Sequence, residues 1–398
     1  MLYLTFGDAP SGVLSSQAID VVKYMRNLTT GHIRFVAFIS PRGFKKNKLK
    51  IKSELPDARV LPMFPKIDTW RWNWITLAIY CLLTGERAVI ARNVLAVHLA
   101  LKVKRLGLIK TICLDGRGAI AAEWHEYNVV PSERLKKDIT TLEKMAVLKT
   151  DFHIAVSNEL VNYWKENYGY DLNSHVVIPC TLGLGFNIDS TTTTTTTATA
   201  TTTTTATTTA ATTAATGTYR KKHNLDEHDV VLIYSGSTAG WQSFNLLEDF
   251  LRPMLNAQKN LKVIFMTGKD ERIDKMIAHF PQQVQRQWVQ HADVQQVLNC
   301  GDYGIMIREL TVTNKVASPT KFAEYLSAGL QVLISEGLGD YTTFVKMHGC
   351  GYVIKQNELL QLEKPTPDIK NENRKLVEMY FTKSSQKENY LKVLNAMH

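Results

Sequence analysis

The stretch Ala317-Ser318-Pro319-Thr320-Lys321-Phe322-Ala323-Glu324-Tyr325-Leu326-Ser327-Ala328-Gly329 carries the most structural information in this chain. Ser318 is a preferred helix N-cap, Pro319 suits the first helical position, and Gly329 can end a helix in the left-handed conformation. The segment therefore predicts a short helix that begins at Pro319. It follows the apolar run Gly304–Ile307, which we expect to be a buried strand.

Similar apolar runs recur along the chain, and most of them precede a helical pattern. Because these runs are continuous rather than alternating, they indicate parallel strands buried on both faces. Two consecutive series of strands and helices predict two doubly wound α/β domains, which bind ligands beyond the carboxyl ends of their strands. The predicted strands are Leu2–Phe6, Ile33–Ile39, Arg59–Pro62, Ala88–Ala91, Thr111–Leu114, Phe152–Val156, Val176–Ile178, Val230–Tyr234, Lys262–Met266, Gly304–Ile307, Val332–Ser335 and Tyr352–Ile354.

The two series are separated by Ser190–Thr218, which consists almost wholly of Thr and Ala. Short, uncharged side chains cannot build a core, so we interpret this run as a flexible interdomain insertion. Alternatively, the letters stand in for residues whose identity is not established. The predicted organisation is a first domain over 1–180, a linker over 181–218 and a second domain over 219–398, whose C-terminal helix is allowed to pack back on the first domain.

The chain has 398 residues and a formal net charge of +10. Such a charge suits phosphate-bearing ligands, an anionic membrane or nucleic acid, and no RGG, zinc-finger or RNP-like signature supports nucleic acid. The five cysteines lie far apart, and the chain start lacks the features of a signal peptide. The longest apolar run, Trp70–Gly85, is too short to span a bilayer. We therefore expect a cytoplasmic protein that could also act at the inner face of the cell membrane.

The predicted helix after Ser318 has the features of a phosphate site. The backbone N–H groups of a first helical turn lack intrahelical partners, and the helix dipole adds partial positive charge there. Lys321 adds a formal charge, and the Glu324 carboxylate on the same face could accept hydrogen bonds from two ribose hydroxyls. Taken alone, Lys321 and Glu324 can equally be an exposed pair that contributes about a few tenths of a kcal/mol.

Further motifs in the second half show that this helix belongs to a larger pattern. Over about 110 residues, their order and spacing resemble the donor domain of GT-B glycosyltransferases, especially the retaining enzymes of glycosyltransferase family 4. The motifs are Ser235-Gly236-Ser237 with Trp241-Gln242, Met266-Thr267-Gly268, His291-Ala292-Asp293-Val294, Cys300-Gly301-Asp302-Tyr303-Gly304-Ile305, Arg308-Glu309, the Ser-Pro-Thr-Lys-Phe-Ala-Glu-Tyr-Leu helix and Gly337-Leu338-Gly339-Asp340.

The resemblance implies the fold class and the donor site. The fold is expected to be α/β and of the GT-B type, with two Rossmann-like doubly wound domains facing each other across a cleft. Glu324 is expected to hold the ribose, and the Gly236 turn is expected to approach the phosphates. The diphosphate is expected at the loop that leads into the helix. The full set of implied donor-binding residues is Gly236, Ser237, Thr267, Gly268, Ser318, Pro319, Thr320 and Glu324.

Two departures from the family pattern affect the expected chemistry. The family's paired glutamates sit eight residues apart, but Val316 stands eight residues before Glu324. Ser237 and Gln242 stand where an Arg and a Lys usually follow the first donor-domain strand. A diphosphate that leaves without a metal ion needs cations, and Arg308 and Lys321 are the best replacements.

Arg308 could alternatively form a surface ion pair with Glu309. No Asp-x-Asp pair is present, and no His/Cys cluster has ligand spacing, so we expect no metal and no cofactor. An Arg in the strand together with Pro-x-Lys before the glutamate points toward the polysaccharide-assembly subset of the family.

The first half resembles the acceptor domain of the same family. The loop Asp8–Val13 follows the first strand, where these enzymes carry a Gly-containing loop near the reacting sugar, and Gly12 would let the backbone approach a ligand. A plain turn is the alternative. The segment Leu114–Gly118 resembles the Asp-x-Arg-Gly segment of capsule and exopolysaccharide transferases. Asp115 would then act catalytically on a sugar hydroxyl, and Arg117 would meet an acceptor phosphate or brace the domain.

Together these expectations describe a metal-independent transferase of the hexosyltransferase type. It would move a sugar with retention from a UDP- or GDP-sugar to a glycan or lipid-linked acceptor, in cell-surface polysaccharide or glycoconjugate assembly. Another GT-B enzyme such as a nucleotide-sugar epimerase, or a scaffold without activity, stays open as an alternative.

Two segments of the first half predict peripheral contact with an anionic membrane. Three tryptophans cluster in Trp70–Ile75, and five lysines lie within Lys45–Lys52. Tryptophan favours the headgroup region, and each Lys near an anionic surface contributes about 1 kcal/mol. The alternative is that the tryptophans are core residues and the lysines belong to a solvated loop.

Overall fold

The computed structural model describes residues 1–64, 67–130, 132–171, 173–188, 219–290, 293–355 and 358–397. The chain divides into two compact units. The predicted interdomain insertion over 190–218, and two residues of the motif at 291–294, lie outside the described residues. Unit 1 consists of Met1–Gly183, Thr311–Ser318 and Thr382–His398, and unit 2 consists of Leu184–Leu310 and Pro319–Phe381.

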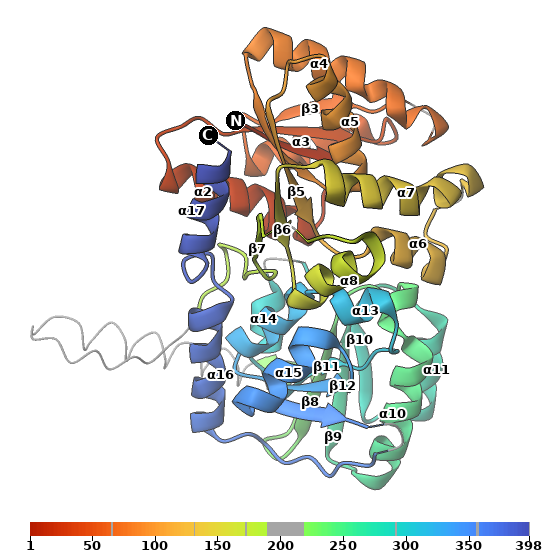
Figure 1. Cartoon of the computed structure of the whole chain (residues 1–398). Helices are drawn as coiled ribbons and strands as arrows, with labels where there is room; N and C mark the ends of the chain where they lie inside the picture. Colours follow the sequence, from red (N-terminus) through yellow and green to blue (C-terminus); the bar gives the residue numbers. More distant parts are fainter. Residues whose placement is uncertain are drawn as a thin grey trace, which may run out of the picture. The chain divides into compact units, whose positions relative to one another are not determined.

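Unit 1 contains a seven-stranded parallel sheet with the order β3-β2-β1-β4-β5-β6-β7. The C-terminal helix α17 packs on α2 and β7 of this unit, as Figure 1 shows at the blue end of the colour scale. The elements are β1 (Leu2–Phe6), α1 (Gly12–Leu14), the π-helical turn η1 (Ser15–Ile19), α2 (Asp20–Leu28), β2 (Arg34–Ile39), α3 (Phe44–Glu54), β3 (Arg59–Pro62), the 3₁₀ turn η2 (Ile67–Trp72), α4 (Asn73–Thr84), β4 (Ala88–Arg92), α5 (Val94–Arg105), β5 (Thr111–Gly116), α6 (Ile120–Tyr127), α7 (Glu133–Lys149), β6 (Phe152–Ala155), α8 (Asn158–Tyr168), β7 (His175–Val177), α13 (Val312–Val316) and α17 (Lys387–Ala396).

The core of unit 1 lies on both faces of its sheet. Successive side chains of a strand point to opposite faces, so Leu2 and Leu4 of β1 enter one cluster and Tyr3 enters the other. Helices α4, α5, α7 and α8 cover the first face, and α2, α3 and α17 cover the second. Burial on both faces explains why the strands are continuous apolar runs.

Unit 2 repeats this plan with a six-stranded parallel sheet in the order β10-β9-β8-β11-β12-β13. The elements are β8 (Val230–Ser235), the 3₁₀ turn η3 (Gly240–Gln242), α10 (Phe244–Ala257), β9 (Leu261–Met266), α11 (Glu271–His279), β10 (Val284–Gln287), α12 (Val294–Leu298), β11 (Tyr303–Met306), α14 (Thr320–Ser327), β12 (Gln331–Ser335), α15 (Gly339–His348), β13 (Gly351–Ile354) and α16 (Pro367–Tyr380).

Each sheet contains one point at which the order of its strands reverses. The order reverses between β1 and β4 in unit 1, and between β8 and β11 in unit 2. At such a reversal the helices that follow the two strands lie on opposite faces, which leaves a crevice at the carboxyl ends of the strands where ligands bind. The fold therefore directs attention to the residues that follow these four strands.

Each predicted strand is present, within a residue or two of its expected bounds. The additional strand β10, Val-Gln-Arg-Gln, was not predicted, because it lies at the edge of its sheet and carries one apolar residue. The start of the predicted helix after β11 was wrong by one residue. Helix α14 begins at Thr320 with Pro319 as N-cap, and the Ser318 hydroxyl instead accepts a hydrogen bond from the Cys180 N–H at 2.7 Å. Gly329 follows the helix with φ of 80°, as predicted.

Helix α14 lies against β11 because Gly304 has no side chain. A Cβ at this position would overlap the ring of Tyr325, which is fully buried. The Tyr325 hydroxyl accepts a hydrogen bond from the Ser235 N–H at 2.9 Å, at the end of β8. The contact between Gly304 and Tyr325 therefore fixes α14 next to the carboxyl ends of β8 and β11.

We expect Gly304→Ala to lower the free energy of unfolding by about 1–3 kcal/mol, because the added methyl group must displace a packed ring. Urea denaturation followed by circular dichroism measures this change. Gly118→Ala is the matched control, because a Cβ there meets no atom within 4 Å and its φ is not positive. Equal stability of the two variants would contradict this account of the contact between α14 and β11.

Candidate functional site

The reversal point of the unit 2 sheet is lined by the turn that follows β8 and by Arg308, which follows β11. Gly236 adopts φ of 138° in this turn, a conformation that side chains rarely allow. A Cβ at Gly236 would lie 3.7 Å from the Lys321 Nζ and 3.8 Å from the Tyr234 hydroxyl. The backbone of the turn thus approaches the side chain of Lys321 from α14.

Two buried cations share one uncharged acceptor at this point. The Lys321 Nζ donates to the Gln242 Oε1 at 2.9 Å, and the Arg308 Nη2 donates to the same oxygen at 3.2 Å. All three residues are less than 8 % exposed. The Lys321 Nζ also lies 4.3 Å from the centre of the Tyr234 ring, where the π-electrons attract a cation.

The electrostatics of this cluster favour an anion. Burial and the positive charge of Arg308 both lower the pKa of Lys321, and Glu324 opposes the shift. No ion pair joins Lys321 to a carboxylate among the residues that the structure describes. Burial raises the pKa of Glu324 to about 7, and Lys321 partly offsets this rise. A dianionic group placed between Lys321 and Arg308 would favour both cations, since the acceptor that they share is a neutral amide oxygen.

The other residues of the predicted donor set lie at different places. The Ser237 carbonyl accepts a hydrogen bond from the Tyr234 hydroxyl at 2.6 Å, so Ser237 belongs to the turn beside Lys321. Thr267 and Gly268 follow β9, the next strand of the sheet, and Thr267 is buried.

Pro319 and Thr320 begin α14 next to Lys321. Ser318 belongs to unit 1. The structure thus brings together Gly236, Ser237, Arg308, Lys321 and Glu324 around the first turn of α14.

A second polar cluster lies at the reversal point of unit 1. Asp115 on β5 is fully buried and accepts a hydrogen bond from the Tyr3 hydroxyl at 2.5 Å. The Arg117 Nε lies 2.7 Å from the Asp115 Oδ1, and the Arg92 Nη1 lies 3.6 Å from the Asp115 Oδ2. Its carboxylate thus contacts Tyr3, Arg92 and Arg117. The expectation that Asp115 acts on a sugar hydroxyl stays a prediction.

The π-helical turn η1 closes this cluster from the other side. The Gln17 carbonyl accepts hydrogen bonds from Arg92 at 3.1 Å and from Arg117 at 3.4 Å. Asp8, just after β1, lies 4.0 Å from the Arg92 Nε. Gly12 is the first residue of α1, and its carbonyl accepts a hydrogen bond from the Ser16 hydroxyl. The formal charges of the carboxylates of Asp8 and Asp115 and the guanidinium groups of Arg92 and Arg117 are thus balanced, and burial raises the pKa of Asp8.

Neither cluster has the composition of a metal site. Within the described ranges, no group of three or more His, Cys, Asp or Glu residues is placed to hold a metal ion. The cations of the unit 2 cluster are the groups available there to neutralise an anionic ligand.

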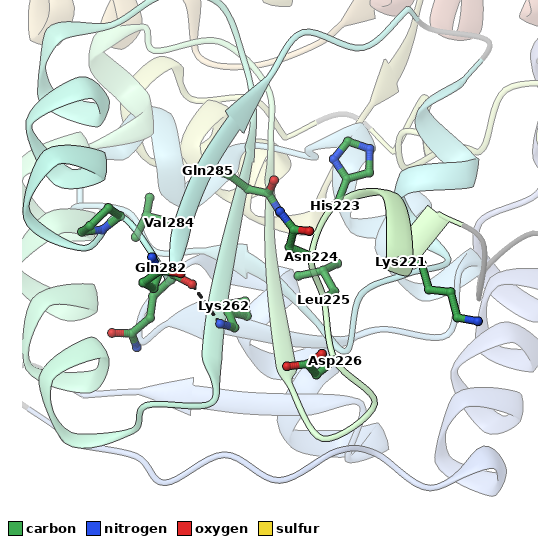
Figure 2. A pocket seen from close by; sticks show the side chains of 11 residues that line it. Lys221, His223, Asn224, Leu225, Asp226, Lys262, Gln282, Val284 and Gln285 are labelled. Carbon is green, nitrogen blue, oxygen red and sulfur yellow. Dashed lines mark hydrogen bonds between the residues drawn. The ribbon is translucent and has the colours of Figure 1, made fainter.

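A cavity of about 480 Å³ lies elsewhere on unit 2, and Figure 2 shows it. Lys262 near the start of β9 donates to the Gln282 carbonyl at 2.8 Å on its wall. Val284 at the start of β10 also lines it. These are the amino ends of the strands, opposite to the Lys321 cluster. No residue of the predicted site lines this cavity.

Several residues of the two clusters were not predicted as site residues, and Gln242, Tyr234 and Arg92 are the most informative of them. Gln242 was noted only as a replacement for a cation, although a polar residue beside the first donor-domain turn is a signal in itself. Tyr234 is the last residue of an apolar run, so the sequence indicates a core residue rather than a site residue. Arg92 ends a predicted strand at the reversal point, so its position after β4 is the signal that could have identified it.

No protein-family model and no curated protein sequence matches this chain. Several solved structures are similar to it. HepE of Anabaena in complex with UDP has a TM-score of 0.70 at 11% sequence identity, and the match covers 99% of each chain. A glycosyltransferase from Rickettsia africae has a TM-score of 0.69 at 13% identity and covers 100% of this chain and 98% of that chain. WaaG, a glycosyltransferase involved in lipopolysaccharide biosynthesis, has a TM-score of 0.60 at 11% identity and covers 100% and 94%.

These similarities, together with the two parallel sheets, show that the two units are Rossmann-like domains of the GT-B fold. The predicted α/β fold class, with two Rossmann-like doubly wound domains, is confirmed.

We expect the unfolding free energy to depend on pH through Glu324. The folded protein retains a proton on Glu324 up to pH about 7, whereas the unfolded chain releases it near the ordinary pKa of 4.5. The stability contributed by this proton is therefore lost as pH rises from about 4.5 to about 7, and Glu324→Gln should gain about 1–3 kcal/mol relative to wild type over that range. Denaturation at a series of pH values measures the difference. The exposed Glu363→Gln serves as control, and the same trend in both variants would refute the assignment to Glu324.

Proposed function

We propose that this chain is a retaining, metal-independent glycosyltransferase that takes its sugar from a UDP- or GDP-sugar. The observation that carries the proposal is the buried pair Lys321 and Arg308, which share the Gln242 oxygen beside the Gly236 turn. Two desolvated cations next to an open backbone turn and a helix start suit a diphosphate. The GT-B fold supports this use, because HepE of the same fold has been solved with UDP.

In the proposed reaction, the bond between the anomeric carbon and the diphosphate oxygen breaks. The electron pair stays on the leaving diphosphate, whose growing negative charge faces Lys321 and Arg308. A bond to the acceptor oxygen forms on the same face of the sugar, and the acceptor proton passes to the leaving phosphate. Because both cations are already fixed by Gln242, they need little reorganisation as charge develops.

Glu324 is proposed to bind the ribose. It lies one helical turn after Lys321, on the same side of α14, and it is only half-buried. A carboxylate at this position can accept hydrogen bonds from two neighbouring hydroxyls. Its raised pKa means that the ionised form, which is the better acceptor, becomes dominant above about pH 7.

Unit 1 is proposed to bind the acceptor near the loop that contains Gly12. Arg117 would contact the acceptor, and Asp115 would act by holding Arg117 and Arg92 in place. The balanced charge of that cluster fits a hydroxyl-bearing glycan better than it fits a diphosphate. The proposed acceptor is a glycan or a lipid-linked sugar of cell-surface polysaccharide assembly. WaaG, a glycosyltransferase of the same fold that is involved in lipopolysaccharide biosynthesis, supports this choice.

We expect Glu324→Ala to weaken UDP or GDP binding at least about tenfold, because each lost hydrogen bond to a charged group costs about 1.5–3 kcal/mol. Isothermal titration calorimetry with UDP and GDP, in buffer that contains EDTA throughout, measures the affinities. Lys321→Met should weaken binding as strongly by removing charge from the diphosphate site.

Glu336→Ala is the matched control, because Glu336 is a glutamate of the same unit that forms an exposed pair with Lys346. Tight binding by both site variants would show that the nucleotide lies elsewhere. A requirement for manganese or magnesium would show that the two cations do not suffice.

We also propose peripheral contact of unit 1 with an anionic membrane. Helix α4 contains no charged residue, and Ile79 and Leu83 on its outer side are 54% and 79% exposed. Trp72 just before α4 is exposed as well, whereas Trp70 is a core residue. Exposed apolar side chains that gather on one helix favour a lipid or protein partner. No helix of the described chain is long and apolar enough to cross a membrane.

The lysines of the predicted basic segment lie on α3, which packs on the opposite face of the sheet from α4. They therefore do not flank the apolar side chains of α4. In this proposal α4 inserts into the headgroup region, and the lysines add attraction toward anionic lipid at longer range.

We expect Leu83→Asp to abolish co-sedimentation with anionic liposomes, because the substitution places a charge in the proposed lipid contact. The assay is run at low and high salt, and wild type should sediment less at high salt. Met347→Asp, which changes an equally exposed apolar residue of unit 2, is the control. Recovery of wild-type protein in the supernatant at low salt would end this proposal.

A further inference from the structure

We propose that the segment Thr311–Ser318 is a positioning segment, and that its attachment to unit 1 sets the geometry of the two cations in unit 2. The chain leaves unit 2 after Leu310, contributes this segment to unit 1 and returns at Pro319. Arg308 lies three residues before the segment and Lys321 lies three residues after it. The inference rests on the proposed function, in which both cations bind the diphosphate.

The start of the segment is held by α6 of unit 1. The Glu126 carboxylate accepts hydrogen bonds from the Val312 N–H at 2.9 Å and from the Thr313 N–H at 3.0 Å. The Thr311 hydroxyl accepts a hydrogen bond from the Asn314 N–H at 3.3 Å. The first N–H groups of α13, which have no partner within the helix, are thus satisfied, two of them by a carboxylate that also interacts favourably with the helix dipole.

Helix α6 is itself anchored in unit 1, so Glu126 is presented from a fixed element. The Glu143 carboxylate of α7 accepts hydrogen bonds from the N–H groups of Ile120 and Ala121, the first two residues of α6. At the other end of α6, the Tyr127 hydroxyl lies 3.0 Å from the Thr311 hydroxyl. Both ends of α6 therefore contribute to one continuous set of contacts.

The end of the segment is held by the core of unit 1. Val316 is 2% exposed and belongs to the main hydrophobic cluster of this unit, and its carbonyl accepts a hydrogen bond from the Ser157 hydroxyl at 2.7 Å. Ser318 accepts from the Cys180 N–H at 2.7 Å, and Lys315 pairs with Glu159 at 3.0 Å. Pro319 follows at once as the N-cap of α14.

These contacts also account for the residue at 316. Where the resemblance predicts the first of two paired glutamates, the chain has a valine that fills part of the unit 1 core. A carboxylate at this position would lose its hydration inside an apolar cluster, which is unfavourable. Val316 thus attaches the segment to unit 1 and does not contact a ligand in this proposal, and the site in unit 2 depends on Arg308 and Lys321.

The test removes the contact at α6 and measures its effect on unit 2. In Glu126→Ala, we expect hydrogen–deuterium exchange to become faster in peptides that cover 305–310 and 319–324, and to stay unchanged in the β12 peptide 331–335. We expect UDP affinity to fall about three- to tenfold, with Glu126→Gln intermediate because an amide oxygen can still accept one hydrogen bond. Asp138→Asn is the matched control, since Asp138 forms an ion pair with Arg71 on the surface of the same unit.

The exchange experiment needs no nucleotide, so it separates this inference from the proposed function. Unchanged exchange on both sides of the segment in Glu126→Ala would overturn the inference. It would also be overturned if wild type binds UDP and Glu126→Ala binds UDP with the same affinity. Faster exchange throughout unit 2, including β12, would also overturn it, because that result means general destabilisation. If exchange in Glu126→Ala becomes faster only in the two flanking peptides, and wild type binds neither UDP nor GDP, the positioning role stands and the proposed donor site is refuted.

Discussion

The shared hydrogen bond of Lys321 and Arg308 to the Gln242 oxygen is the interaction on which the candidate site depends. Two like charges held this close in a buried place repel each other, and a neutral amide offsets only part of that cost. Burial, and after it the charge of Arg308, lowers the pKa of Lys321. A bound anion would reduce the repulsion between these two buried cations, and perturbed charged groups of this kind are typical of binding sites.

The fold maintains this arrangement through rigid elements rather than through the loops alone. Arg308 follows β11, and its backbone N–H donates to the Ser335 hydroxyl at the end of β12. Lys321 is held by α14, which rests on β11 where Gly304 leaves room for Tyr325. Each cation is thus tied to a buried element of unit 2, and the chain between these two elements is the segment Thr311–Ser318 that belongs to unit 1.

The sequence predicted most of the fold but only part of the site, and particular residues explain the difference. Continuous apolar runs identified the buried strands, whereas the polar edge strand β10 carries no such signal. Ser318 matches the N-cap preference, but its hydroxyl bonds to Cys180, a residue far away in the sequence. Asp115 matches a motif, but its burial depends on Tyr3 and Arg117, which only the folded sheet brings together. Local patterns cannot encode such long-range partners.

The two reversal points of the sheets differ in the groups that face their cations. In unit 1, Asp8 and Asp115 neutralise Arg92 and Arg117, so a second anion would have to compete with carboxylates that are already in place. In unit 2, Lys321 and Arg308 share the neutral amide oxygen of Gln242 as an acceptor, where Arg92 and Arg117 of unit 1 share the carboxylate of Asp115. In the proposed function a diphosphate suits the second arrangement better, because the acceptor that Lys321 and Arg308 share carries no charge. Under that proposal each unit provides a crevice of the same origin, and the neutral amide of Gln242 distinguishes the crevice assigned to the anion.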